Sequence, residues 1–161
     1  MNAAELVEKI RKELGRGSRQ GHRPSAQIDF GVYTGELRGV VRNFKKELKG
    51  ESGEFVLQIA NALIDENVTD CRQVAYELIA AHKPPRELLN EKVVIQLGQR
   101  LDNWCCVDNF CCYIAGAALR EGRISDSLIE KWISPMTSGF DVAPWLSTQN
   151  RAAEKEILNG P

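Results

Sequence analysis

The apolar residues of this chain recur with the 3.6-residue period of an α-helix along its whole length. The period-2 alternation of β-branched residues that marks a half-buried strand is missing. The clearest case is the segment 71–82, in which one continuous stripe comprises Cys71, Val74, Ala75, Leu78, Ile79 and His82. The sequence therefore predicts an all-α protein with no sheet.

Gly and Pro residues divide this pattern into about eight helices, two of which are expected to run unbroken over 86–100 and 102–119. Helices of this size, without one long central apolar helix, favour a stack of antiparallel pairs over a four-helix bundle. We therefore expect an α-solenoid that forms a single domain over residues 1–161. The stretch 16–32 is rich in Gly and Arg and is expected to connect two helices without regular structure. The expected helices begin near residues 4, 34, 52, 71, 86, 102, 125 and 141.

The composition narrows the class of protein. Of the 161 residues, 43% are apolar and 27% are charged, which excludes intrinsic disorder. The longest uncharged stretch, 109–119, is far shorter than the ~20 apolar residues that span a bilayer, so we expect no membrane segment. An odd number of cysteines and an N-terminus without an apolar secretory signal predict reduced thiols and a cytoplasmic location.

The charges are distributed unevenly. Residues 1–50 contain 11 Lys and Arg against 6 Asp and Glu, whereas residues 51–161 contain 10 against 16. Residues 1–50 are thus basic overall, and residues 51–161 are acidic overall. This pattern indicates either a solvated helix surface or a surface that binds a polyanion.

Four cysteines near residue 108 invite a zinc interpretation, which helix geometry opposes. Cys105 and Cys112 share a helix face but stand ~10 Å apart along the axis. One ion with bonds of ~2.3 Å cannot bridge that distance. We therefore expect no metal and no cofactor, and we interpret Cys105, Cys106, Cys111 and Cys112 as small buried residues that let helices pack closely.

Asp108 is the only charged residue between Asp102 and Arg120, and its sequence neighbours are apolar or thiol-bearing. We therefore expect Asp108 to be a partly buried carboxylate. Such a group needs hydrogen-bonding or charged partners, or else its pKa is raised. Asp108 could tie a neighbouring helix through backbone N–H groups or an arginine. Alternatively, Trp104 lies one turn earlier, and an indole beside a carboxylate makes a pocket for a cation or for developing positive charge.

Three blocks of the chain, in this order, resemble the DNA alkylation repair family of AlkD-like DNA glycosylases, which are built from HEAT-like repeats. The blocks are FGVYTGELR at residues 30–38, RQVAYELI at 72–79, and LDNW followed by Asp108 and Phe110 at 101–110. The resemblance implies an α-solenoid that holds duplex DNA. It also implies hydrolysis of the N-glycosidic bond of cationic alkylated purines, such as N3- or N7-alkylpurines.

Carried over by position, Asp108 would be the catalytic carboxylate and Trp104 an aromatic wall of the site. A cationic purine is already a good leaving group, so an ionised Asp108 would stabilise the oxocarbenium-like sugar and place a water. The partner would be double-stranded DNA with alkylated bases. The residues expected to contact its phosphates are Arg38, Arg42, Lys45 and Arg151.

Family domains usually extend further beyond the catalytic segment than this chain does. Trp145 is the late tryptophan that could stand in for the family's second aromatic wall. A truncated chain, a short member completed by a homodimer or another partner, and a relative without glycosylase activity would each explain the length. The alternative function is a non-catalytic helical-repeat scaffold that binds DNA or protein.

Overall fold

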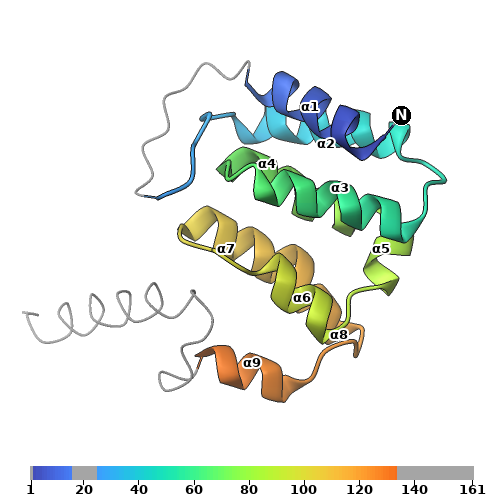
Figure 1. Cartoon of the computed structure of the whole chain (residues 1–161). Coiled ribbons are helices and arrows are strands. Elements are labelled where there is room, and N and C mark those ends of the chain that lie inside the picture. Colours follow the sequence, from blue (N-terminus) through green and yellow to red (C-terminus); the bar gives the residue numbers. More distant parts are fainter. Residues whose placement is uncertain (1, 16–24, 134–161) are drawn as a thin grey trace, which may run out of the picture.

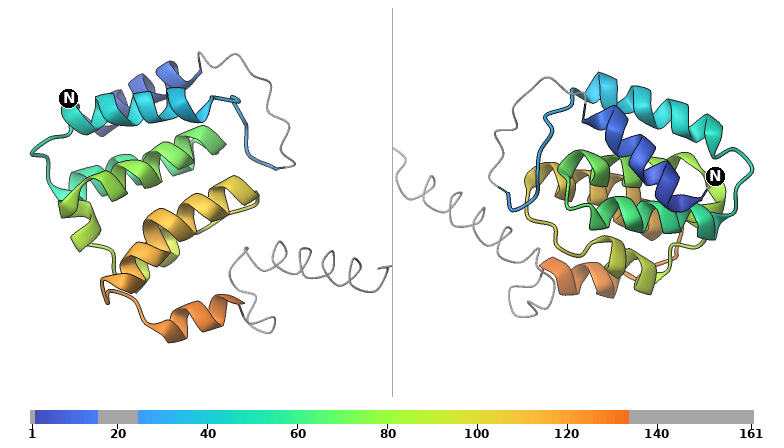
Figure 2. Two further views of the ribbon diagram at one scale, coloured as in Figure 1. Left: turned by 180° about the vertical axis from the view of Figure 1, so that it is seen from behind. Right: turned by 45° about the horizontal axis from the view of Figure 1, so that its top comes forward.

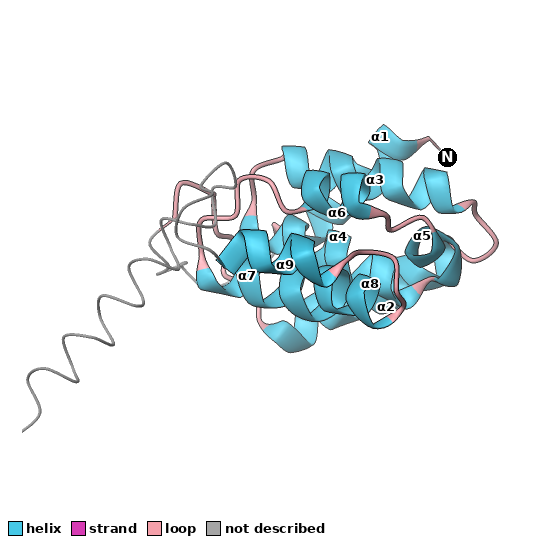
Figure 3. Ribbon diagram, turned by 90° about the horizontal axis from the view of Figure 1, so that it is seen from below, coloured by secondary structure: helices cyan, strands magenta, loops and turns pink. Residues whose placement is uncertain are grey.

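The structure of the protein is a computed structural model, and it describes residues 2–15 and 25–133. No strand occurs among these residues, which confirms the predicted all-α class (Figure 3). A single parallel bridge joins Ile28 to Val68. The helices are α1 (Ala3–Leu14), α2 (Thr34–Glu47), α3 (Gly53–Asp65), α4 (Thr69–Ala81), α5 (Lys83–Glu87), α6 (Glu91–Leu97), α7 (Trp104–Phe110), the π-helical turn η1 (Cys111–Ala115), α8 (Gly116–Arg120) and α9 (Asp126–Ile133).

The helices stack in two layers (Figures 1 and 2). Helix α1 packs on α2 and α3 packs on α4, while α1 also packs on α3 and α2 on α4. Helix α4 packs in turn on α7 and η1. Seen from behind, α2, α4 and α7 lie side by side as one layer, with α1, α3 and α6 in the other. The core therefore lies between the layers. The outer face of the layer formed by α2, α4 and α7 is not covered by the other layer.

Helices α1 to α4 turn their predicted apolar stripes to the core. In α4, the stripe from Cys71 to Ile79 is buried as predicted, while His82 follows the last helical residue and is half-buried. Asn2 starts α1 through a capping box with Glu5, and Ser52 caps α3 by accepting from Phe55 N. The polar caps and the apolar stripes together account for where these helices begin and which side they bury.

The predicted helix over 86–100 is divided in two by its own caps. Pro84 and Pro85 end the preceding helix. They also lie in the first turn of α5, where a missing backbone N–H is tolerated. Asn90 then caps α6 by accepting a hydrogen bond from Val93 N. A side-chain cap in the middle of an apolar run therefore breaks the expected helix.

The predicted helix over 102–119 is interrupted by the π turn η1, in which the N–H of Gly116 donates to the carbonyl of Cys111. A Cβ atom on Gly116 would lie 2.6 Å from that carbonyl oxygen, so a glycine permits the wide turn at this position. The side chains that follow are rotated relative to those of an uninterrupted α-helix.

Residues 25–32, which we call the strap, cross the N-terminal ends of α4 and α7. Asp102 accepts hydrogen bonds from Ser25 Oγ and Ala26 N, each at 2.7 Å. Asp70 accepts from Phe30 N at 2.8 Å and from Val32 N at 3.2 Å. The strap is thus irregular, as predicted, but it is fixed by two carboxylates. Residues 16–24, the expected helix from residue 141, Trp145 and Arg151 lie outside the described residues.

Gly53, the first residue of α3, is expected to tolerate no side chain. A Cβ atom there would lie 2.7 Å from the backbone carbonyl group of Pro84 and 2.8 Å from Leu88 Cδ1. Gly53→Ala should therefore lower the free energy of unfolding by about 1–3 kcal/mol. The matched control is Gly35→Ala in α2, where nothing lies within 4 Å and alanine favours the helix. Thermal denaturation of both variants checks this, and an equal melting temperature for the two would contradict it.

Candidate nucleic-acid interface

One side of α2 carries a stripe of exposed cations. Arg38, Arg42 and Lys45 are spaced by about one turn each and lie next to the side that buries Leu37 and Phe44. Because the buried side faces the core between the layers, the three cations lie on the outer face of the layer formed by α2, α4 and α7. All three residues were predicted from the sequence as phosphate contacts.

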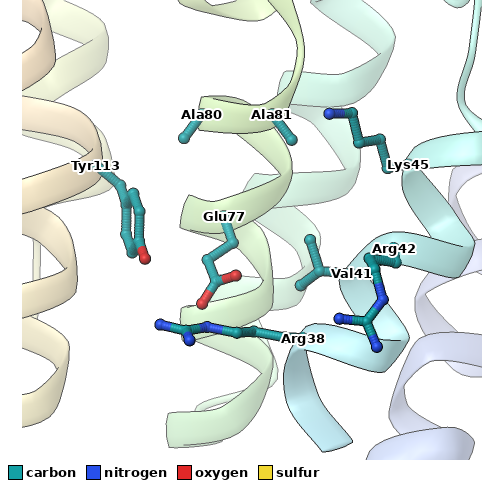
Figure 4. A pocket seen from close by; sticks show the side chains of 8 residues that line it. All are labelled: Arg38, Val41, Arg42, Lys45, Glu77, Ala80, Ala81 and Tyr113. Carbon is teal, nitrogen blue, oxygen red and sulfur yellow. The ribbon is translucent and has the colours of Figure 1, made fainter. Parts of the chain in front are cut away.

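These cations line a hollow that the sequence did not predict (Figure 4). Its floor and far wall come from α4 and η1, so residues far apart in sequence meet there. The lining residues are Arg38, Val41, Arg42, Lys45, Glu77, Ala80, Ala81 and Tyr113. The hollow is therefore basic on its α2 side and aromatic on its η1 side.

Glu77 projects into the middle of this hollow. Figure 4 shows its carboxylate beside the guanidinium of Arg38, with the ring of Tyr113 across the hollow. Burial raises the pKa of Glu77, although the positive charge of Arg38 acts in the opposite direction. This position of Glu77 could not be predicted from the sequence, because an acid on the polar side of an amphipathic helix is ordinarily a solvated surface residue.

Asp108 is exposed, so the expectation of a partly buried carboxylate was wrong. Its neighbours Val107 and Cys106 are buried, but successive residues of a helix differ in direction by about 100°, and Asp108 points away from the side that they bury. Among the described residues, no arginine or backbone N–H group bonds to its side chain, so it does not tie a neighbouring helix. An exposed carboxylate carries its charge without a large desolvation cost.

Trp104 is also exposed, to 53% of its surface, and it begins α7 one turn before Asp108. The start of α7 is fixed by Asn103, which accepts a hydrogen bond from Cys106 N at 3.0 Å. Asn103 Nδ2 lies 3.2 Å from Asp102 Oδ1, the carboxylate that holds the strap. Trp104 and Asp108 are not among the residues that line the hollow, but α7 belongs to the same layer as α2 and α4.

The five cysteines differ in burial. Cys71 and Cys106 are buried, and burial raises the pKa of each thiol to about 12. Cys105 is half-buried. Cys111 and Cys112 lie in the π turn and are exposed, so the packing interpretation was wrong for them. The described part of the chain contains no group of three His, Cys, Asp or Glu side chains that could hold a metal ion.

Fold and surface together define an all-α protein of packed helices with a cationic outer face. The sequence model of the family described as "DNA alkylation repair enzyme" matches residues 4–136. The chain belongs to this family, which indicates a role in DNA repair. Neither the curated proteins nor the solved structures include a match. Within the described residues, no helix is long and apolar enough to cross a membrane.

Proposed function

We propose that this protein is a DNA glycosylase that hydrolyses the N-glycosidic bond of cationic alkylated purines in duplex DNA. The observation that carries the proposal is the exposed pair of Trp104 and Asp108 on α7, in the same layer as the cationic stripe of α2. Family membership supports the repair role. The pair supplies an anion and an electron-rich ring where a positively charged nucleotide would need both.

In the proposed reaction, the C1′–N bond breaks and the purine leaves as a neutral alkylated base. The sugar then develops positive charge, which the Asp108 carboxylate stabilises. A water adds to C1′, and Asp108 orients it and accepts its proton. Trp104 contributes a ring face to the cationic nucleotide. No general acid is required, because the leaving base already carries the positive charge.

The DNA backbone would be held by Arg38, Arg42 and Lys45, whose contacts to phosphates carry no sequence information. Arg151, which lies outside the described residues, remains a proposed fourth contact. The experiment that tests the function is a single-turnover assay of 7-methylguanine release from methylated duplex DNA. Release at a rate above the spontaneous rate is expected. No release by protein that still binds the duplex would favour the non-catalytic scaffold.

Glu77→Gln is expected to raise the affinity for duplex DNA at neutral pH by about 2- to 5-fold, because it removes a negative charge beside the cations that contact phosphates. The raised pKa of Glu77 means that the wild-type carboxylate becomes neutral as the pH falls through that value. The difference between variant and wild type should therefore shrink on acidification. Fluorescence anisotropy at several pH values checks this, and a constant difference would contradict it.

A further inference from the structure

The hollow between α2, α4 and η1 contains polar groups that the described part of the chain leaves without a partner. Glu77 is half-buried, and within residues 2–15 and 25–133 its carboxylate forms no ion pair and accepts no hydrogen bond. The hydroxyl group of Tyr113 likewise has no hydrogen-bond partner among these residues. Removing a carboxylate from water is costly unless it is hydrogen-bonded. The arrangement therefore leaves hydrogen-bonding capacity for a ligand.

The hollow has the size and the floor of a small-molecule site. Its volume is about 380 Å³, within the ~300–1,000 Å³ that such sites span. The short side chains of Ala80 and Ala81 on α4, together with Val41 on α2, make part of the lining apolar. An apolar lining with a ring on one side and a few polar groups suits a planar ligand that carries polar atoms on its edge.

The charges in the hollow restrict the ligand further. Arg38, Arg42 and Lys45 disfavour a simple cation, and Glu77 disfavours a simple anion. A ligand that satisfies both sides has hydrogen-bond donors for the carboxylate and a negative charge for the α2 cations. A nucleotide combines these features with a planar ring. Arg42 and Lys45 lie about 6 Å and about 10 Å further along α2 than Arg38, so they remain available to a phosphate beyond the base.

The identity of the base follows from the two groups that lie side by side. Figure 4 shows the Glu77 carboxylate, an acceptor, beside the Arg38 guanidinium, a donor. The Watson–Crick edge of guanine presents two adjacent donors, N1–H and N2–H, beside the acceptor O6. The two carboxylate oxygens match the two donors, and the guanidinium matches O6. The same edge of adenine or cytosine has only one amino donor beside its ring acceptor, which leaves one carboxylate oxygen unused.

We propose that this hollow binds an unpaired guanine nucleotide, with Glu77 accepting from N1–H and N2–H and Arg38 donating to O6. Tyr113 packs against the base, as aromatic side chains do in sites for unpaired bases. The Watson–Crick edge is occupied in a duplex, so the ligand is either a free mononucleotide or an unpaired base of a DNA strand. This inference goes beyond the proposed function, since it requires neither an alkylated base nor base release.

The first test uses the wild-type protein and three mononucleotides in isothermal titration calorimetry. Deoxyguanosine monophosphate (dGMP) should bind at least about 10-fold more tightly than deoxyadenosine monophosphate (dAMP), because a hydrogen bond to a charged group is lost with adenine. Deoxyinosine monophosphate, which lacks the 2-amino group of guanine, should fall between them. Equal affinities for dGMP and dAMP, or no binding of dGMP, would overturn the proposal.

Glu77→Gln separates base recognition from a simple charge effect. The variant should bind dGMP about 10-fold more weakly, because an amide replaces one of the two accepting oxygens by a donor. Its affinity for duplex DNA should rise, as expected above, so the two ligands respond in opposite directions. A rise for both ligands would show that Glu77 acts only through its charge and would overturn the proposal. The matched control is Glu54→Gln, an exposed acid of α3 in the other layer, which should change neither affinity.

The contact with Tyr113 is tested by a pair of variants. Tyr113→Ala should weaken dGMP and dAMP alike by at least about 5-fold, since packing against an aromatic ring does not depend on the base. Tyr113→Phe keeps the ring and should retain most of the affinity. Circular dichroism checks that both variants are folded. Unchanged affinity in folded Tyr113→Ala would overturn the placement of the base.

A last comparison distinguishes the two sources of the nucleotide. A thymine strand with one central guanine is compared with the all-thymine strand, so that contacts to the phosphates cancel. A guanine-dependent gain in affinity that Glu77→Gln removes would assign the hollow to an unpaired base of a strand. Binding of dGMP without such a gain would assign it to the free nucleotide. Absence of both would overturn the proposal, whereas failure to release 7-methylguanine would count against the glycosylase function alone.

Discussion

Asp108→Asn is expected to abolish the release of 7-methylguanine, with a fall in the single-turnover rate of at least about 10²–10³-fold. The substitution keeps the size of the side chain but removes the negative charge that would stabilise the sugar cation. Because Asp108 is exposed on α7, the fold should be unaffected. The affinity for duplex DNA should stay equal or rise, since one charge that repels phosphates is lost.

The matched control for this variant is Glu130→Gln, which removes one exposed negative charge from α9. It should retain the wild-type rate. If Asp108→Asn also retains that rate, the catalytic assignment is wrong. If wild type and both variants bind DNA and release no base, the scaffold function remains.

Asp70→Ala is expected to lower the free energy of unfolding by about 2 kcal/mol. The Asp70 side chain is 1% exposed and accepts the backbone N–H groups of Phe30 and Val32. In the variant, these two N–H groups of the strap would lose their acceptor. The control is Asp65→Ala, whose carboxylate makes an exposed ion pair with Arg100 at 2.8 Å and should contribute less than about 1 kcal/mol. Urea denaturation of the two variants measures the difference.

The stabilising effect of Asp70 should also depend on pH. Burial raises its pKa although the two N–H donors lower it, so the folded protein binds this proton more tightly than the unfolded chain. The stabilisation that comes from binding this proton is fully present below the pKa of Asp70 in the unfolded chain, near 4. It is lost as the pH rises through the pKa of Asp70 in the folded protein. The gap between wild type and Asp70→Ala should therefore be wider at about pH 4.5 than at about pH 8. A gap that narrows on acidification would contradict the assigned direction.

The fold could be predicted in large part because each of the helices α1 to α4 buries a stripe that is visible in its own sequence. In α1, the spaced apolar residues Leu6, Val7, Ile10 and Leu14 are all buried. The interruptions were harder to predict, because they depend on single groups: the Asn90 side chain that divides α5 from α6, and Gly116, which permits the π turn. Neither changes the apolar periodicity around it.

The candidate site was predicted in part. The cationic stripe of α2 follows from spacing alone, since turns of a helix repeat every 3.6 residues. Glu77 and Tyr113 could not be placed, because they meet Arg38 only when α2 and η1 pack on the two sides of α4. The burial of Asp108 was predicted wrongly from its sequence neighbours, which on a helix are not its neighbours in space.

The π turn at Cys111–Ala115 holds one residue more than an ordinary helical turn needs. Deleting a single residue there would restore regular winding without shifting the buried Phe110 before it or Ala118 after it from the core. The orientation of Tyr113 would change instead, and with it the aromatic wall of the hollow. A one-residue insertion or deletion is thus the smallest evolutionary step that could reshape this surface while sparing the hydrophobic interior.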